Sequence, residues 1–129
     1  MNKFSNRSLA TLATVDIRLQ DIANLAIQIS KVDFGIPSSG GLRTEEEQRE
    51  LFNQGVSKID GTTKKSFHQT GKALDFYAYV DGRASWSPGH LAQVACAFLQ
   101  AASLLGYKLE WGGLWVNFVD MPHVQLQDG

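Results

Sequence analysis

Residues 73–80 constrain the fold of this chain most, because apolar and polar side chains alternate there over eight residues. One face of the extended segment is apolar and comprises Leu74, Phe76, Ala78 and Val80. A period of two residues predicts a β-strand that is buried on one side. Asp81-Gly82 follows directly and predicts a tight hairpin turn. The chain is therefore expected to form an antiparallel sheet with one face against a core.

Three helical segments are available to cover that face. Residues 9–30 carry apolar side chains at mostly helical spacing and predict one amphipathic helix or two short ones. Thr44-Glu-Glu-Glu47 is a capping box that begins a second helix. Ser87-Pro88 begins a third helix, which Gly106 ends. The one cysteine, Cys96, lies in an apolar run of this last helix and is expected to be buried.

Further strands are predicted by short apolar segments at residues 33–36, 107–111 and 123–126. The sequence has no internal repeat, no low-complexity tail and no linker, so one domain covering residues 1–129 accounts for the whole chain. We expect an α+β fold in which helices pack on a central, mainly antiparallel sheet.

The charge pattern argues against nucleic acid as the main partner. The 12 Lys and Arg residues nearly balance the 13 Asp and Glu residues, and no run of basic residues stands out. No apolar stretch reaches membrane-spanning length, and the N-terminus lacks the apolar core of a secretory signal. We expect a monomer that is made in a cytoplasm and does not bind membranes.

Three side chains of the types that bind zinc occur in two short motifs. His68 and Asp75 belong to the run Ser66-Phe-His-Gln-Thr-Gly-Lys-Ala-Leu-Asp75, and His123 ends the run Asp120-Met-Pro-His123. A glycine between the first two lets the chain turn back, so that imidazole and carboxylate can meet at one metal ion. Three such ligands leave a fourth position of zinc open, as in catalytic sites. Taken alone, a His and an Asp at this spacing more often form an ordinary hydrogen bond.

Hydrolysis at a zinc site in a surface cleft also needs a proton acceptor and a group that stabilises developing negative charge. Asp120, three residues before His123, can reach the same cleft; the alternative is a solvated loop aspartate. Arg43 lies immediately before the capped helix and is a candidate for the charge-stabilising group; the alternative is a surface ion pair. His90, the third histidine, has no acidic partner nearby and is expected to be a surface residue.

Five ordered motifs resemble those of the L-alanyl-D-glutamate peptidases, which are zinc peptidases that include many phage endolysins and some bacterial cell-wall hydrolases. The motifs are Gly41-Leu-Arg-Thr-Glu-Glu-Glu-Gln48, Gly55-Val-Ser-Lys-Ile-Asp-Gly61, the run from Ser66 to Asp75, Glu110-Trp-Gly-Gly113 and Asp120-Met-Pro-His-Val-Gln125. The resemblance spans residues 8–126, nearly the whole chain. The family is related to the D-alanyl-D-alanine carboxypeptidases and to the dipeptidases of vancomycin resistance.

The resemblance implies that Zn²⁺ is bound by His68, Asp75 and His123. It gives Asp120 the role of general base and Arg43 that of polarising the scissile carbonyl. The implied activity is endopeptidase cleavage between L-alanine and D-glutamate in the peptide stems of bacterial peptidoglycan, by a phage endolysin that lyses its host. Such a protein would be made in the host cytoplasm and would act on the wall after release by another protein.

Several residue roles stay open at this point. Many relatives carry glutamate where this chain has Asp120, and Glu110 is a second candidate for the base, although an anchoring hydrogen bond is its favoured role. Trp111 and Trp115 either line a groove for the stem peptide or pack in the interior. Ser66 and Gln69 are expected to support the loop that carries a metal ligand.

Two other functions also stay open. One is a D-alanyl-D-alanine carboxypeptidase, which would use the same zinc chemistry on another bond. The other is a wall-binding module that contains zinc but has no catalytic activity. The presence of both Arg43 and Asp120 argues against such a module, because binding alone requires neither residue.

Overall fold

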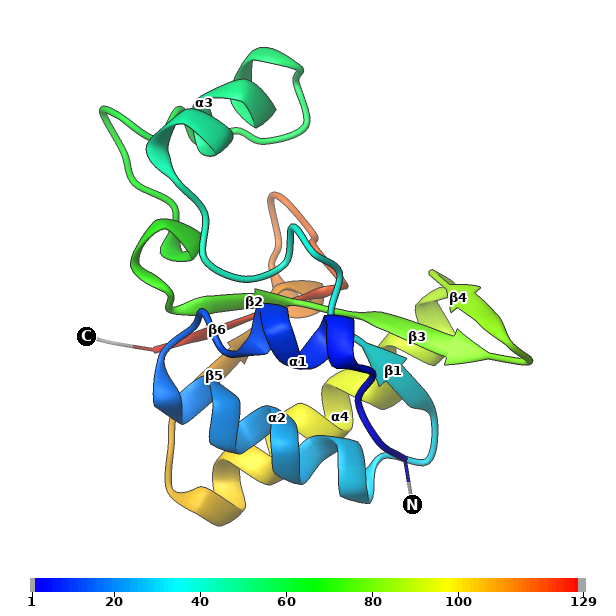
Figure 1. Cartoon of the computed structure of the whole chain (residues 1–129). Helices are drawn as coiled ribbons and strands as arrows, with labels where there is room; N and C mark the ends of the chain where they lie inside the picture. Colours follow the sequence, from blue (N-terminus) through cyan, green and yellow to red (C-terminus); the bar gives the residue numbers. More distant parts are fainter. Residues whose placement is uncertain (1, 128–129) are drawn as a thin grey trace.

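The computed structural model describes residues 2–127 and confirms an α+β fold (Figure 1). The helices of this region are α1 (Asn6–Leu12), α2 (Ile17–Ile29), α3 (Glu45–Asn53) and α4 (Pro88–Leu105). The strands are β1 (Asp33–Gly35), β2 (Ala73–Asp75), β3 (Tyr77–Val80), β4 (Arg83–Ser85), β5 (Leu109–Trp111) and β6 (His123–Leu126). Two 3₁₀ turns are η1 (Phe67–Thr70) and η2 (Gly112–Leu114). Residues 1, 128 and 129 of the expected domain lie outside the described residues.

The strands form two small antiparallel sheets, with the orders β1-β3-β4 and β2-β6-β5, which corrects the expectation of one central sheet. The predicted strand over residues 73–80 divides at Phe76, whose N–H donates to Pro122 O at 2.9 Å. Before this residue the chain pairs with β6, and after it the chain pairs with β1. Leu74, Phe76 and Ala78 are all fully buried, so the alternation continues across the division. The pattern of apolar residues therefore could not reveal the change of pairing partner.

Helices α2 and α4 pack against each other beneath the strands (Figure 1). The segment 9–30 forms two helices, because the chain turns after Leu12 and Asp16 caps α2 through a hydrogen bond from the Arg18 N–H. Helices and strands share one core, whose fully buried members include Leu19, Ile22, Leu74, Phe76, Val94 and Phe98. Within residues 2–127, no helix combines the length and the apolar character that crossing a membrane requires.

The predicted turn and cap residues adopt the conformations that their types favour. Thr44 Oγ1 accepts from the Glu47 N–H at 3.1 Å, and Glu47 Oε1 accepts from the Thr44 N–H at 2.9 Å, so the capping box of α3 is confirmed. Asp81 and Gly82 both have positive φ, at 53° and 79°, as a tight hairpin turn requires. Gly106 ends α4 in the left-handed conformation.

Cys96 is exposed, which corrects the expectation of a buried thiol. The buried positions of α4 around it include Val94, Ala95 and Phe98. Because α-helical residues advance by about 100° each, from 3.6 residues per turn, Cys96 lies beyond the buried face. An apolar run on a helix therefore does not bury every residue in it.

The side of the strands opposite α2 and α4 carries the features that form a cleft. Helix α3 and the loop 56–66 that follows it lie there, and so does the segment 112–122 between β5 and β6 (Figure 1). A cleft of about 500 Å³ opens between these segments and includes residues of β2 and β6 among its lining. This arrangement brings residues from both halves of the chain to one place.

Candidate metal centre and its cleft

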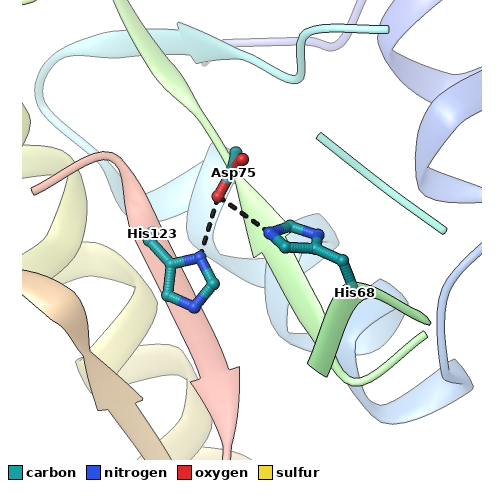
Figure 2. A group of neighbouring side chains, drawn as sticks. All are labelled: His68, Asp75 and His123. Carbon is teal, nitrogen blue, oxygen red and sulfur yellow. Dashed lines mark hydrogen bonds and ion pairs between the residues drawn. The ribbon is translucent and has the colours of Figure 1, made fainter. Parts of the chain in front are cut away.

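His68, Asp75 and His123 converge from η1, β2 and β6, with their side chains pointing toward one another (Figure 2). One potential ligand atom from each of the three lies within 4.8 Å of the other two. Asp75 Oδ1 is 3.2 Å from His68 Nε2 and 2.9 Å from His123 Nδ1. Asp75 and His123 are direct partners in the β2–β6 ladder. The three residues that the sequence singled out as ligands are therefore brought together.

A capped 3₁₀ turn positions His68. Ser66 Oγ accepts from the His68 N–H at 3.1 Å, and Gln69 Oε1 accepts from the Ser66 N–H at 2.8 Å, so both residues support the turn as expected. Gly71 ends the turn at φ 72°, a conformation that costs little only for glycine, and the chain reverses into β2. His68 Nδ1 lies 3.0 Å from Gly41 O. Because a carbonyl only accepts, Nδ1 carries a proton, and Nε2 is the ring nitrogen that faces Asp75.

His123 is oriented through its other ring nitrogen. Gln125 Nε2 donates to Glu110 Oε1 at 2.6 Å, so Gln125 turns its oxygen toward His123. His123 Nε2 lies 2.8 Å from that oxygen and donates to it, which leaves Nδ1 as the ring nitrogen that faces Asp75. Metal-binding histidines commonly donate their outer N–H to an oxygen in this way. The donor set and its surroundings therefore fit a divalent cation such as Zn²⁺.

The charges of the centre favour a cation. Burial alone would raise the pKa of Asp75, but the hydrogen bonds from His123 and His68 outweigh it and hold that pKa well below its usual value. Burial would lower the pKa of His123, but the hydrogen bond to Asp75 and the charge of Asp75 raise it overall. The centre thus holds an ionised carboxylate between two imidazoles, and a bound metal ion would replace the protons that it attracts.

Arg43 faces this centre with a side chain that is only 12% exposed. Its Nη2 atom is 3.7 Å from Asp75 Oδ2, and its backbone N–H donates to His68 O at 2.9 Å. Burial lowers the pKa of the Arg43 guanidinium, and the charge of Asp75 opposes that shift. The structure therefore places Arg43 in the cleft beside two of the candidate ligands.

Gln48 fixes Arg43 and was not identified from the sequence as part of the site. Its Oε1 atom accepts from Arg43 Nη1 at 2.8 Å, and its Nε2 atom donates to Ser57 Oγ and Ile59 O. The side chain is fully buried. Ser57 and Ile59 lie in the loop after α3, and Arg43 lies before α3. No local sequence pattern therefore predicts that Gln48 joins them. Gln125 was also missed, although it lies two residues after His123 and therefore shares its face of β6.

Asp120 lies in the cleft beside the ligands. Its Oδ2 atom is 3.9 Å from His123 Nδ1, and its backbone N–H donates to Gly112 O at 2.9 Å. Burial raises the pKa of Asp120, and the nearby His123 opposes that shift. Glu110, the second candidate for the base, bonds to Gln125 and is not part of the cleft lining. The geometry thus gives Glu110 the anchoring role that the sequence favoured.

Trp111 and Trp115 have different positions. Trp111 packs against the core, and its Nε1 donates to Met121 O at 2.7 Å. Trp115 lines the cleft, and its ring centroid is 5.2 Å from that of His123. His90 is half-buried in the first turn of α4, where its Nδ1 lies 2.7 Å from Ser85 Oγ, and it is not part of the cleft lining.

Fold and site together define a small α+β protein with a His–Asp–His candidate metal centre in a cleft. A family profile described as "Phage L-alanyl-D-glutamate peptidase" matches residues 1–127. The chain belongs to this family, which confirms the expectation from the five motifs, and it is a peptidase.

Individual relatives agree with this assignment. The L-alanyl-D-glutamate peptidase of Escherichia phage T5 is 37% identical over 114 residues, which cover 88% of this chain and 81% of that protein. The peptidoglycan L-alanyl-D-glutamate endopeptidase CwlK of Bacillus subtilis is 31% identical over 97 residues, or 67% of this chain and 57% of CwlK. The crystal structure of the Serratia marcescens L-Ala D-Glu endopeptidase ChiX matches with a TM-score of 0.86 and 35% identity, covering 98% of this chain and 91% of ChiX.

Proposed function

We propose that this protein is a zinc-dependent endopeptidase that hydrolyses the L-alanyl-D-glutamate bond of peptidoglycan stem peptides. His68, Asp75 and His123 would hold the zinc ion. The observation that carries this proposal is the convergence of three ligand atoms within 4.8 Å. The names of the relatives supply the bond, and the lack of cysteine among the three ligands suits a catalytic zinc site.

Zn²⁺ bound at this centre would supply Lewis-acid chemistry, which lowers the pKa of a water molecule and polarises a carbonyl group. Asp120, beside the centre, accepts a proton from the attacking water as the new C–O bond forms. It then gives that proton to the nitrogen of D-glutamate as the C–N bond breaks. Arg43 stabilises the negative charge that develops on the carbonyl oxygen. The products are an L-alanine carboxyl end and a D-glutamate amino end.

The biological setting is part of the proposal. The protein would serve as a phage endolysin, made in the host cytoplasm and acting on the cell wall after release. Peptidoglycan would be its partner, with residues 1–129 acting as one monomeric zinc peptidase domain. This setting is supported by the phage relatives, among them the L-alanyl-D-glutamate peptidase of Listeria phage A118, which is 37% identical over 85 residues. The chain covers 28% of that larger protein.

Digestion of purified peptidoglycan tests the proposed bond. The expected products carry new L-alanine carboxyl ends and D-glutamate amino ends, and a chelator should prevent their formation. Release of free D-alanine instead would identify a carboxypeptidase. Zinc-loaded protein that binds the wall without forming any new ends would identify a binding module.

A further inference from the structure

One wall of the cleft carries three lysines that form no ion pair with a carboxylate of residues 2–127. Lys58, Lys64 and Lys65 belong to the loop between α3 and η1, line the cleft and are exposed. We refer to these three residues as the lysine wall. Within the described residues 2–127, none of the three is in an ion pair with an acidic side chain. Lys58 Nζ lies 5.2 Å from the ring centroid of Phe118, across the cleft mouth.

The acidic groups near the lysine wall are engaged elsewhere. Asp60, in the same loop, accepts hydrogen bonds from the Thr63 hydroxyl and from the backbone N–H groups of Thr62, Thr63 and Lys64. These bonds lower the pKa of Asp60 to about 2, so it is ionised, but it is outnumbered by the three lysines. In the cleft, Asp75 lies between His68, His123 and Arg43, and Asp120 Oδ2 lies 3.9 Å from His123 Nδ1. A bound divalent cation would neutralise the charge of that carboxylate further.

The loop that carries the lysine wall is held in place by side-chain contacts. Gln48 Nε2 donates to Ile59 O at 2.7 Å, and Gln69 Nε2 donates to Gly61 O at 3.0 Å. The Gly61 N–H donates to Lys64 O at 3.0 Å, which closes the turn. Lys64 and Lys65 directly precede Ser66, the residue that caps the turn carrying His68. The backbone that carries the three lysines is therefore held in place beside the cleft that contains the candidate metal centre.

The substrate of the proposed function carries a matching negative charge. A glutamate residue has two carboxyl groups, and only one of them can form the onward peptide bond. The other carboxyl group stays free. It belongs to the same residue as the nitrogen of the bond that breaks, so it lies within the length of a glutamyl side chain of that nitrogen. We propose that the lysine wall binds this free carboxylate of the D-glutamyl residue, and that the enzyme therefore discriminates against stem peptides in which it is amidated. This inference rests on the proposed function, and it adds the residues that set substrate choice.

Two soluble stem peptides test the inference, one with D-glutamate and the other with the same residue amidated at its free carboxyl group. We expect a kcat/KM ratio of about ten in favour of the free carboxylate, the size expected for one charge-assisted contact at an exposed site. The triple variant Lys58→Gln/Lys64→Gln/Lys65→Gln should bring this ratio close to one. The single variants should each reduce the ratio and would replace the triple variant if it does not fold.

A matched control removes the same charge elsewhere. Lys3, Lys31 and Lys108 are exposed and do not line the cleft, so Lys3→Gln/Lys31→Gln/Lys108→Gln should keep the wild-type ratio. A wild-type ratio near one, or an unchanged ratio in the cleft variants, would overturn the inference. It would also be overturned if the cleft variants lost activity on whole walls but kept the ratio on soluble peptides, since the lysines would then attract the anionic wall in general.

A binding measurement separates failure of the inference from failure of the proposed function. Dissociation constants of the two peptides are measured with zinc-loaded Asp120→Asn, which should cleave them at least about 10²-fold more slowly than the wild-type protein. A tenfold preference for the free carboxylate that disappears in the lysine variants would support the lysine wall even if the wild-type protein hydrolysed neither peptide. Equal dissociation constants would reject it even if hydrolysis proceeded.

Discussion

At the scale of single residues, the site depends on which nitrogen each histidine turns inward. His68 directs Nε2 to Asp75 because Gly41 O holds Nδ1, and His123 directs Nδ1 because Gln125 holds Nε2. The two imidazoles therefore present opposite ring nitrogens to one point. Residues outside the ligand set are needed to fix this arrangement.

Gln125→Leu should weaken zinc binding, because it removes the acceptor that orients His123. Loss of such an orienting contact typically costs about 10- to 100-fold in metal affinity. Competition with a chromophoric chelator measures the change. Gln127→Leu is the control, since Gln127 lies on the same segment and, among residues 2–127, its side chain donates to Glu110 and not to a candidate ligand. Equal zinc affinities of the two variants would contradict the orienting role of Gln125.

Asp120→Asn should lose activity while keeping zinc, because the amide retains the shape of the side chain but cannot accept a proton. A general base typically contributes about 10²- to 10⁴-fold in rate. Peptide hydrolysis gives kcat, and zinc content is measured on the same samples. Glu110→Gln should remain active, since its amide oxygen can still accept from Gln125. If Asp120→Asn kept the wild-type kcat and Glu110→Gln lost it, Glu110 would be the base.

Zinc affinity should fall with acidification, and the fall should begin above the usual histidine range. Zinc binds neutral imidazole, whereas the pKa of His123 in the metal-free protein is raised, so protons compete with the metal at a higher pH than for an ordinary histidine. Calorimetric zinc titrations across the pH range check this. An apparent midpoint at or below about 6.5, the usual histidine pKa, would contradict the expectation.

At the scale of elements, local patterns were predictable and pairing partners were not. The capping box at Thr44, the turn at Asp81-Gly82 and the α4 boundaries follow from short-range chemistry, and the structure confirms them. The division of the 73–80 segment at Phe76 depends on which distant strand lies beside each half, and this information is absent from the alternation itself. The prediction that Cys96 is buried was wrong, because an apolar run on a helix does not show which of its residues face the core.

The same distinction holds for the site. His68, Asp75 and His123 could be singled out because potential metal ligands are chemically distinctive residue types, here in short motifs. Gln48 is an ordinary helix residue, and only the fold brings its amide between Arg43 and the loop after α3. The lysine wall is likewise unremarkable in sequence, because the three lysines gain meaning from the cleft that they line.

The turn η2 should control the position of Asp120. A Cβ atom on Gly112 would lie 2.3 Å from Asp120 O, so Gly112→Ala must displace the segment that carries Asp120. We expect kcat to fall at least tenfold, the minimum for displacing a group that contributes about 10²-fold or more. Gly89→Ala is the control, since nothing lies within 4 Å of the added carbon. Wild-type kcat in Gly112→Ala would show that Asp120 needs no precise placement.

At the scale of the whole molecule, α2 and α4 provide the packed layer on which the strands rest, and the cleft opens on the other side (Figure 1). The candidate ligands come from the middle and from the end of the chain, and the β2–β6 ladder joins them. The candidate metal centre therefore forms only in the folded protein. The proposed function requires one zinc ion at this centre for cleavage of the L-alanyl-D-glutamate bond.

Titration of metal-free protein with Zn²⁺, with new D-glutamate amino ends on peptidoglycan as the readout, tests this claim most directly. We predict no new ends without metal, a linear rise with added zinc, and a plateau at one equivalent per chain. His68→Ala, titrated in parallel, should form none over the same range. Formation of the ends by rigorously metal-free protein, or the same response in His68→Ala, would contradict the claim.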